Sequence, residues 1–99
     1  YQTHASGLIG SASLRVLGLA YEALGEHARS ADHFLKAVEL FDAQGEELDQ
    51  AETLRHLGRV RRRLGDADGA ERALSAALAR YRRLGHAETE QVLTELRGA

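Results

Sequence analysis

The residues whose type and spacing best indicate chemistry are four arginines in the second half of the chain. Arg55, Arg59 and Arg62 follow one another at intervals of four and three residues, and Arg63 lies beside them. In a helix this spacing places the guanidinium groups on one face. Because a guanidinium can bind a carboxylate through two parallel hydrogen bonds, the face predicts a site for an acidic peptide, a C-terminal carboxylate or an acidic protein surface.

The alternative for these arginines is a solvated helix face that is partly paired with Glu52. Exposed ion pairs contribute about 0.2–1 kcal/mol each, whereas a micromolar complex needs about 8 kcal/mol. Charge would therefore select and steer an acidic partner, while apolar side chains would supply most of the affinity.

Signatures of catalysis and of metal or cofactor binding are missing from the sequence. There is no cysteine, and the five histidines form neither an HExxH motif nor an i, i+4 pair, so we expect no metal site and no thiol nucleophile. Ser30, Asp32 and His33 are the residue types of a hydrolytic triad, but three neighbours on one helix point in different directions. We expect a protein that is not an enzyme and that holds no cofactor.

Charge and composition fit one small globular domain of 99 residues, with 43% hydrophobic and 28% charged residues. Residues 1–50 carry a net charge of −5 and residues 51–99 a net charge of +3. This asymmetry would favour head-to-tail contact between copies or with a preceding repeat, and the alternative is scattered surface charge. The negative overall charge and the lack of aromatic residues among the arginines argue against direct nucleic-acid binding. No apolar run or signal peptide indicates a membrane segment. The absence of methionine predicts a fragment of a longer chain.

Hydrophobic periodicity without proline predicts an all-helical chain. Apolar residues recur three and four positions apart in four segments, as expected for one buried helical face. A glycine follows each segment where a left-handed cap would lie: Gly25, Gly45, Gly65 and Gly85. Asp66 is expected to cap the fourth helix.

A short fifth helix should cap the C-terminal end. Its apolar side chains are expected to face inward, and they are Val92, Leu93 and Leu96. Its polar side chains are expected to stay in solvent, and they are Glu88, Gln91 and Glu95. A polar outer surface is what the last unit of a stacked helical array requires.

The chain repeats itself with a period of 40 residues. Gly18 falls on Gly58 at this offset, and both glycines are expected to let antiparallel helices approach closely, because a glycine inside a helix otherwise costs about 1 kcal/mol. Three of the five aromatic residues keep the same spacing: Tyr1, Phe41 and Tyr81. In this register Tyr1 belongs to the end of an earlier helix. The period predicts stacked helical hairpins.

Two copies of one motif follow this period. The first runs Leu14-x2-Leu17-Gly18-x2-Tyr21, then Gly25, Ser30-x3-Phe34 and Ala37. The second runs Leu54-x2-Leu57-Gly58-x2-Arg61, then Gly65, Ala70-x3-Leu74 and Ala77. Both copies resemble the tetratricopeptide repeat, whose usual period is about 34 residues and whose first position is usually tryptophan. A period of 40 also lies near that of HEAT and armadillo repeats, which are the alternative fold.

The resemblance implies an all-α, tetratricopeptide-like solenoid segment of antiparallel helical hairpins. Residues 1–6 would end a preceding repeat, residues 7–45 and 46–85 would form two repeats, and residues 86–99 would form the capping helix. The first helix of each repeat lines a concave groove in this family. The candidate partner-binding residues on that groove are Arg15, Leu19, Glu22, Arg55, Arg59, Arg62 and Arg63.

The resemblance also implies a non-catalytic interaction or regulatory module. Its expected partner is an acidic protein or peptide, which includes another domain of the same chain. The alternative is a structural, self-associating array that positions other domains. The long period and the ending from Leu84 to Leu96 are similar to the C-terminal arrays of actinobacterial multidomain transcriptional regulators, which implies a cytoplasmic regulator.

Overall fold

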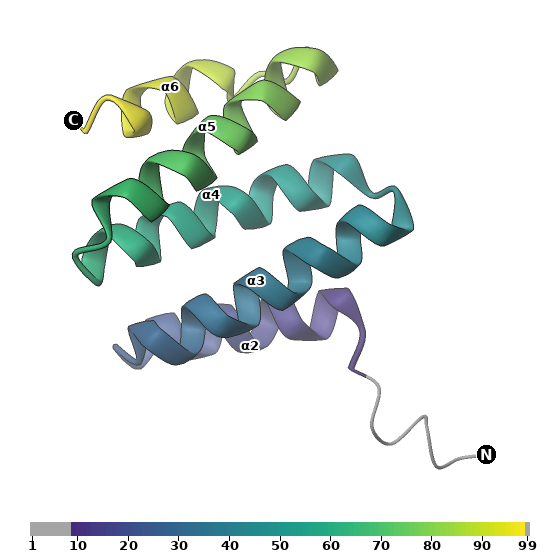
Figure 1. Cartoon of the computed structure of the whole chain (residues 1–99). Coiled ribbons are helices and arrows are strands. Elements are labelled where there is room, and N and C mark those ends of the chain that lie inside the picture. Colours follow the sequence, from purple (N-terminus) through teal and green to yellow (C-terminus); the bar gives the residue numbers. More distant parts are fainter. Residues whose placement is uncertain (1–8, 99) are drawn as a thin grey trace.

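This computed structural model describes residues 9–98, which contain five α-helices joined by short turns. They are α2 (Ser11–Ala23), α3 (His27–Gln44), α4 (Glu47–Arg63), α5 (Ala67–Leu84) and α6 (Thr89–Leu96). Each helix packs against the next one along the chain and reverses its direction (Figure 1). The predicted all-α fold of antiparallel hairpins is confirmed. The predicted preceding-repeat segment, with Tyr1, lies outside the described residues.

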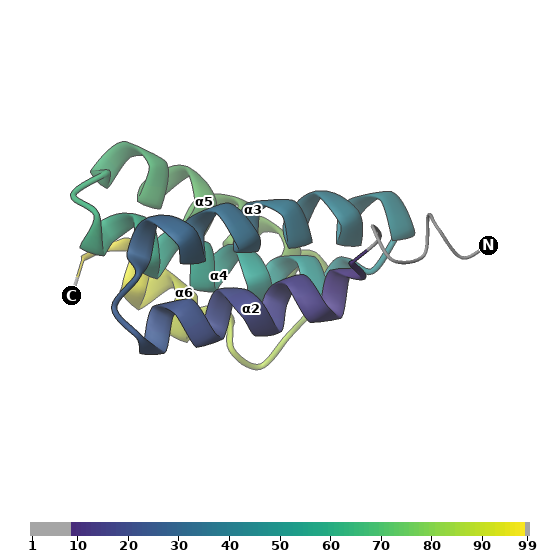
Figure 2. The ribbon, with the colours of Figure 1, turned by 90° about the horizontal axis from the view of Figure 1, so that it is seen from below.

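The helices form two layers. Viewed from below, α3 and α5 lie on one side, while α2, α4 and α6 lie on the other (Figure 2). Short turns join consecutive helices. Glycines supply the left-handed conformation that these turns need: φ is 72° at Gly45 and 64° at Gly85. The Asp66 carboxylate accepts a hydrogen bond of 2.9 Å from the Gly69 N–H, so the predicted helix cap is confirmed.

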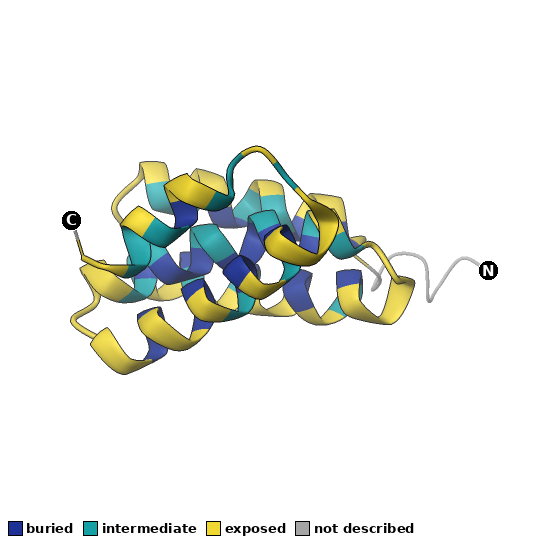
Figure 3. Ribbon diagram, turned by 90° about the horizontal axis from the view of Figure 1, so that it is seen from above, coloured by how far each residue is buried: buried dark blue, intermediate teal, exposed yellow. Residues whose placement is uncertain are grey.

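Apolar side chains between the two layers form the core (Figure 3). The main cluster joins the last four helices and contains Phe34, Val38, Ala51, Leu54, Leu57, Val60, Ala73, Ala77, Leu78, Tyr81 and Val92. A smaller cluster joins α2 and α3 and contains Leu14, Ala37 and Phe41. As predicted, α6 turns its apolar residues inward, with Val92 fully buried.

Two helical glycines set how closely the layers approach. A Cβ atom on Gly18 would lie 2.5 Å from the Phe34 ring, and one on Gly58 would lie 2.7 Å from Leu74 Cγ. The buried Ser30 hydroxyl donates a hydrogen bond of 2.6 Å to the Gly18 carbonyl and so also joins α3 to α2 at this glycine. The prediction that these glycines permit close helix packing is confirmed.

None of the helices within residues 9–98 combines the length and the apolar character that a membrane-spanning segment needs.

Candidate functional site

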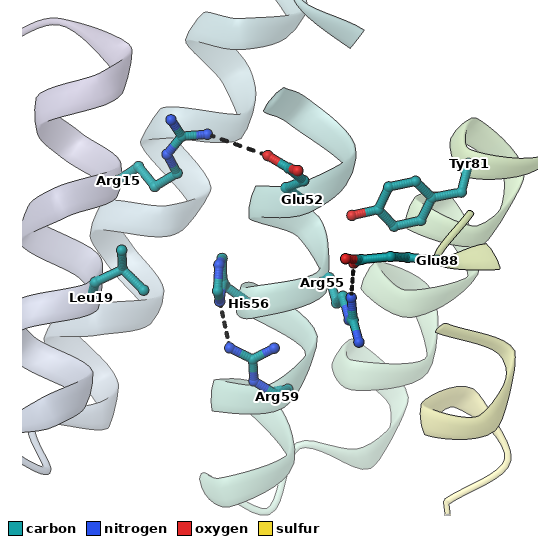
Figure 4. A pocket seen from close by; sticks show the side chains of 8 residues that line it. All are labelled: Arg15, Leu19, Glu52, Arg55, His56, Arg59, Tyr81 and Glu88. Carbon is teal, nitrogen blue, oxygen red and sulfur yellow. Dashed lines mark hydrogen bonds and ion pairs between the residues drawn. The ribbon is translucent and has the colours of Figure 1, made fainter. Parts of the chain in front are cut away.

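A pocket of about 350 Å³ lies between α2, α4 and the segment that joins α5 to α6 (Figure 4). Its lining residues are Arg15 and Leu19 from α2, Glu52, Arg55, His56 and Arg59 from α4, Tyr81 from α5, and Glu88. The α4 residues recur at intervals of three, one and three positions, so they occupy one face of that helix. The opposite face of α4 enters the core.

The pocket brings together four of the seven predicted partner-binding residues. Arg15, Leu19, Arg55 and Arg59 line it. The other three do not. Glu22 is half-buried on α2, whereas Arg62 and Arg63 are exposed in the last turn of α4, where cations interact favourably with the helix dipole.

Arg55 is held by two carboxylates. Its Nη1 donates to Glu88 at 2.5 Å, and its Nη2 and Nε donate to Glu95 at 2.6 and 3.0 Å. These hydrogen bonds, foremost those with Glu95, raise the pKa of Arg55 further above its usual range despite partial burial. The expectation that Glu88 and Glu95 stay in solvent holds only in part, because their carboxylates turn back toward α4 while both side chains remain partly exposed.

Arg15 is held in the same way one repeat earlier. Its Nη1 donates to Asp49 at 2.9 Å and lies 3.9 Å from a Glu52 oxygen. The guanidinium also lies over the Phe41 ring, 5.1 Å from its centroid, which is a cation–π geometry. In each repeat, the arginine of the first helix therefore pairs with acids on or just before the next helix of the same layer.

Arg59 differs from the other two pocket arginines. Its Nη2 contacts His56 Nδ1 at 2.5 Å, and no carboxylate among residues 9–98 lies within the 4.0 Å of an ion pair. Because a guanidinium has only donors, His56 must accept this hydrogen bond with a neutral ring. Arg59 thus keeps a positive charge that the described chain does not neutralise.

His56 is the pocket residue whose protonation is most disturbed. Burial, followed by the charges of Arg59, Arg15 and Arg55, lowers its pKa from 6.5 to about 4. One face of its ring stacks on Phe34, with centroids 5.4 Å apart. Sequence reasoning placed His56 at a surface or helix seam and missed the site, although its spacing from Glu52 and Arg59 puts it on the same helix face.

We expect His56 to make folding sensitive to acid. The pKa of His56 is lower in the folded protein than in the unfolded chain. The contribution of the neutral ring to the free energy of unfolding is therefore fully present above about pH 6.5 and is lost as pH falls toward 4. After allowance for solvent screening of a partly exposed ring, the loss should be on the order of 1–2 kcal/mol. Urea unfolding at pH 7 and pH 5 measures it, with His56→Gln as the non-titrating control. Equal losses for both proteins would contradict the assignment.

Tyr81 lines the pocket from α5. The residue is fully buried, and its oxygen has no hydrogen-bond partner among residues 9–98. Burial, foremost, and the nearby Glu52 carboxylate raise the pKa of the phenol, whereas the neighbouring Arg55 cation opposes the rise. Within those same residues, no group of three or more histidine or acidic side chains is arranged to hold a metal ion.

Stacked antiparallel helical hairpins, with a pocket lined mainly by α2 and α4, define a helical-repeat protein. A family model described as tetratricopeptide repeat matches residues 8–83. The chain therefore belongs to the tetratricopeptide repeat family, which decides against the HEAT and armadillo alternative. This family generally mediates protein–protein interactions and is generally non-catalytic. Neither the curated proteins nor the solved structures contain a match.

Proposed function

We propose that this protein is an interaction module that binds an acidic peptide or protein surface at the pocket between α2 and α4. The observation that supports the proposal is Arg59, which lines the pocket without a carboxylate partner within the described range. A positive group in a recess attracts and orients acidic groups. Leu19, which is 39% exposed beside it, offers the apolar contact that affinity requires.

The arginine face divides into parts with different roles. Arg15 and Arg55 are engaged with acids of this chain, so each must give up a partner to bind another carboxylate. Arg62 and Arg63 are exposed beyond the pocket and would steer an acidic partner toward Arg59 by long-range attraction.

Arg59→Gln should weaken binding of an acidic probe about five- to tenfold, because one charge-assisted contact is lost. The probe is a fluorescein-labelled ten-residue peptide of aspartate, glutamate and leucine, titrated at low salt and followed by fluorescence anisotropy. Arg72→Gln is the matched control, since Arg72 is exposed on α5 and does not line the pocket. Equal weakening by both variants would show that the probe responds only to total charge. Arg55 is unsuitable for this test, because its replacement would also release two glutamates.

The sequence resemblance to actinobacterial regulators supports a role for this module inside a larger regulatory protein. We place this module at the C-terminal part of a cytoplasmic transcriptional regulator, where the acidic partner can be another protein or another domain of the same chain. The two repeats at residues 7–45 and 46–85 would form the platform, with residues 86–99 as its cap.

A second candidate function, self-association into a structural array, is favoured by the outer face of α2. Ala12, Ser13, Val16 and Leu17 line an apolar recess of about 460 Å³ there, and Val16 is 61% exposed. Exposed apolar patches of this kind mark interaction surfaces. Molar mass measured against protein concentration separates the two functions, because only self-association requires it to rise.

A further inference from the structure

We propose that Arg55 forms a carboxylate-binding site that the chain occupies with its own Glu88 and Glu95, and that the neighbouring Tyr81 hydroxyl is left for an incoming carboxylate. An acidic partner in the pocket would then exchange for these two carboxylates. The inference rests on the proposed function, because it concerns how the same pocket becomes available to a partner.

The occupied state is visible in the hydrogen bonds of Arg55. Glu95 accepts from Nε through Oε1 and from Nη2 through Oε2, which is the paired geometry by which arginine recognises a carboxylate, and Glu88 accepts from Nη1. Only 18% of the Arg55 side chain is exposed in this arrangement. A partner's carboxylate can reach this guanidinium fully only after one of the two glutamates leaves it.

Tyr81 provides the second observation at this site. Its hydroxyl is buried and unpartnered among residues 9–98, and it is directed into the pocket with Glu88 lying beside it (Figure 4). A buried hydroxyl without a partner is unfavourable, and native proteins seldom leave one. A carboxylate that replaced Glu88 could accept a hydrogen bond from this hydroxyl and from Arg55 together.

The two glutamates lie on the part of the fold that is easiest to detach. Glu88 directly precedes α6 and Glu95 lies within it, and α6 is an eight-residue helix with one fully buried side chain, Val92. So short a helix has little stability of its own and depends on its packing. Segments with few buried contacts open at the lowest free-energy cost in a folded protein.

The earlier repeat shows how the two arginine sites differ in what holds their acids. The acids that hold Arg15 are Asp49 and Glu52, and both lie on α4, which contributes seven buried residues. Their backbone cannot move away from Arg15 without unfolding the middle of the array, so only rotation of their side chains would free that guanidinium. The acids that hold Arg55 are tied only to the terminal helix.

The test compares two double variants of equal charge for binding of the labelled acidic peptide. Glu88→Gln/Glu95→Gln removes the internal carboxylates but keeps hydrogen-bond acceptors. Glu39→Gln/Glu71→Gln removes the same charge from exposed positions outside α6. The first variant should bind about fivefold more tightly than the second, since its binding no longer includes displacement of the internal carboxylates. Saturating the wild type with peptide should also speed amide hydrogen exchange in residues 89–96.

Equal affinities of the two double variants, or unchanged exchange in α6, would overturn the inference. If Arg59→Gln still weakened binding in that case, the proposed function would stand without it. If the peptide bound none of the proteins, both would fall. Circular dichroism verifies folding, and Glu88→Gln alone provides a milder variant with the same expected direction, because 47% of the Glu88 side chain is exposed.

Discussion

Phe34→Ala should lower the free energy of unfolding by about 3–5 kcal/mol, which is the cost of removing a buried aromatic ring. Phe34 is 0% exposed. It fills the space left by Gly18, stacks on His56 and belongs to the main core cluster. The ring therefore joins α2, α3 and α4, and its loss leaves a cavity where the two hairpins meet. Urea unfolding followed by circular dichroism measures the change.

Leu35→Ala is the control for this experiment. Leu35 is the next residue on α3 and is 39% exposed, so its truncation should cost well under half as much. Similar losses from the two substitutions would contradict the packing described for Phe34.

Gly58→Leu should destabilise the protein by about 1–3 kcal/mol through overpacking. Even the Cβ atom of the new side chain would lie 2.7 Å from Leu74 Cγ and 3.4 Å from the Ala70 carbonyl oxygen. The gain of up to about 1 kcal/mol from replacing a helical glycine would offset only part of this cost. Thermal and urea unfolding both report the net effect.

The control for this substitution is Ala79→Leu, at an exposed position of α5, where a change within about 0.5 kcal/mol is expected. An unchanged or raised midpoint for Gly58→Leu would show that α4 and α5 can separate without loss. The close helix packing assigned to the glycine would then be wrong.

The helices and their ends could be predicted because the signals that define them are local. Apolar spacing marks the buried face of each helix, and a glycine such as Gly45 or Gly85 adopts the left-handed conformation that few other residues tolerate. The period of 40 residues then predicted which helices are equivalent. Gly18 and Gly58, identified from that period, do lie where side chains of the facing helix approach.

The pocket could be predicted only in part, because its chemistry depends on contacts between distant residues. The spacing of Arg55 and Arg59 correctly placed both on one helix face. It did not show that Glu95, 40 residues after Arg55, binds Arg55. Nor did it show that Arg59 forms no ion pair with a carboxylate among the described residues. The lowered pKa of His56 likewise arises from burial and neighbouring charges, which a linear pattern does not contain.

The most direct test of the central claim is an NMR titration of the ¹⁵N-labelled protein with the unlabelled acidic peptide at low salt. Binding at the pocket predicts that the largest amide shift changes fall around Leu19, Arg55 and Arg59. It also predicts that their midpoint moves to about five- to tenfold higher peptide concentration in Arg59→Gln but stays unchanged in Arg72→Gln. Changes confined to α2 with none around Arg55 and Arg59, or no changes at saturating peptide, would contradict an arginine-lined recognition site.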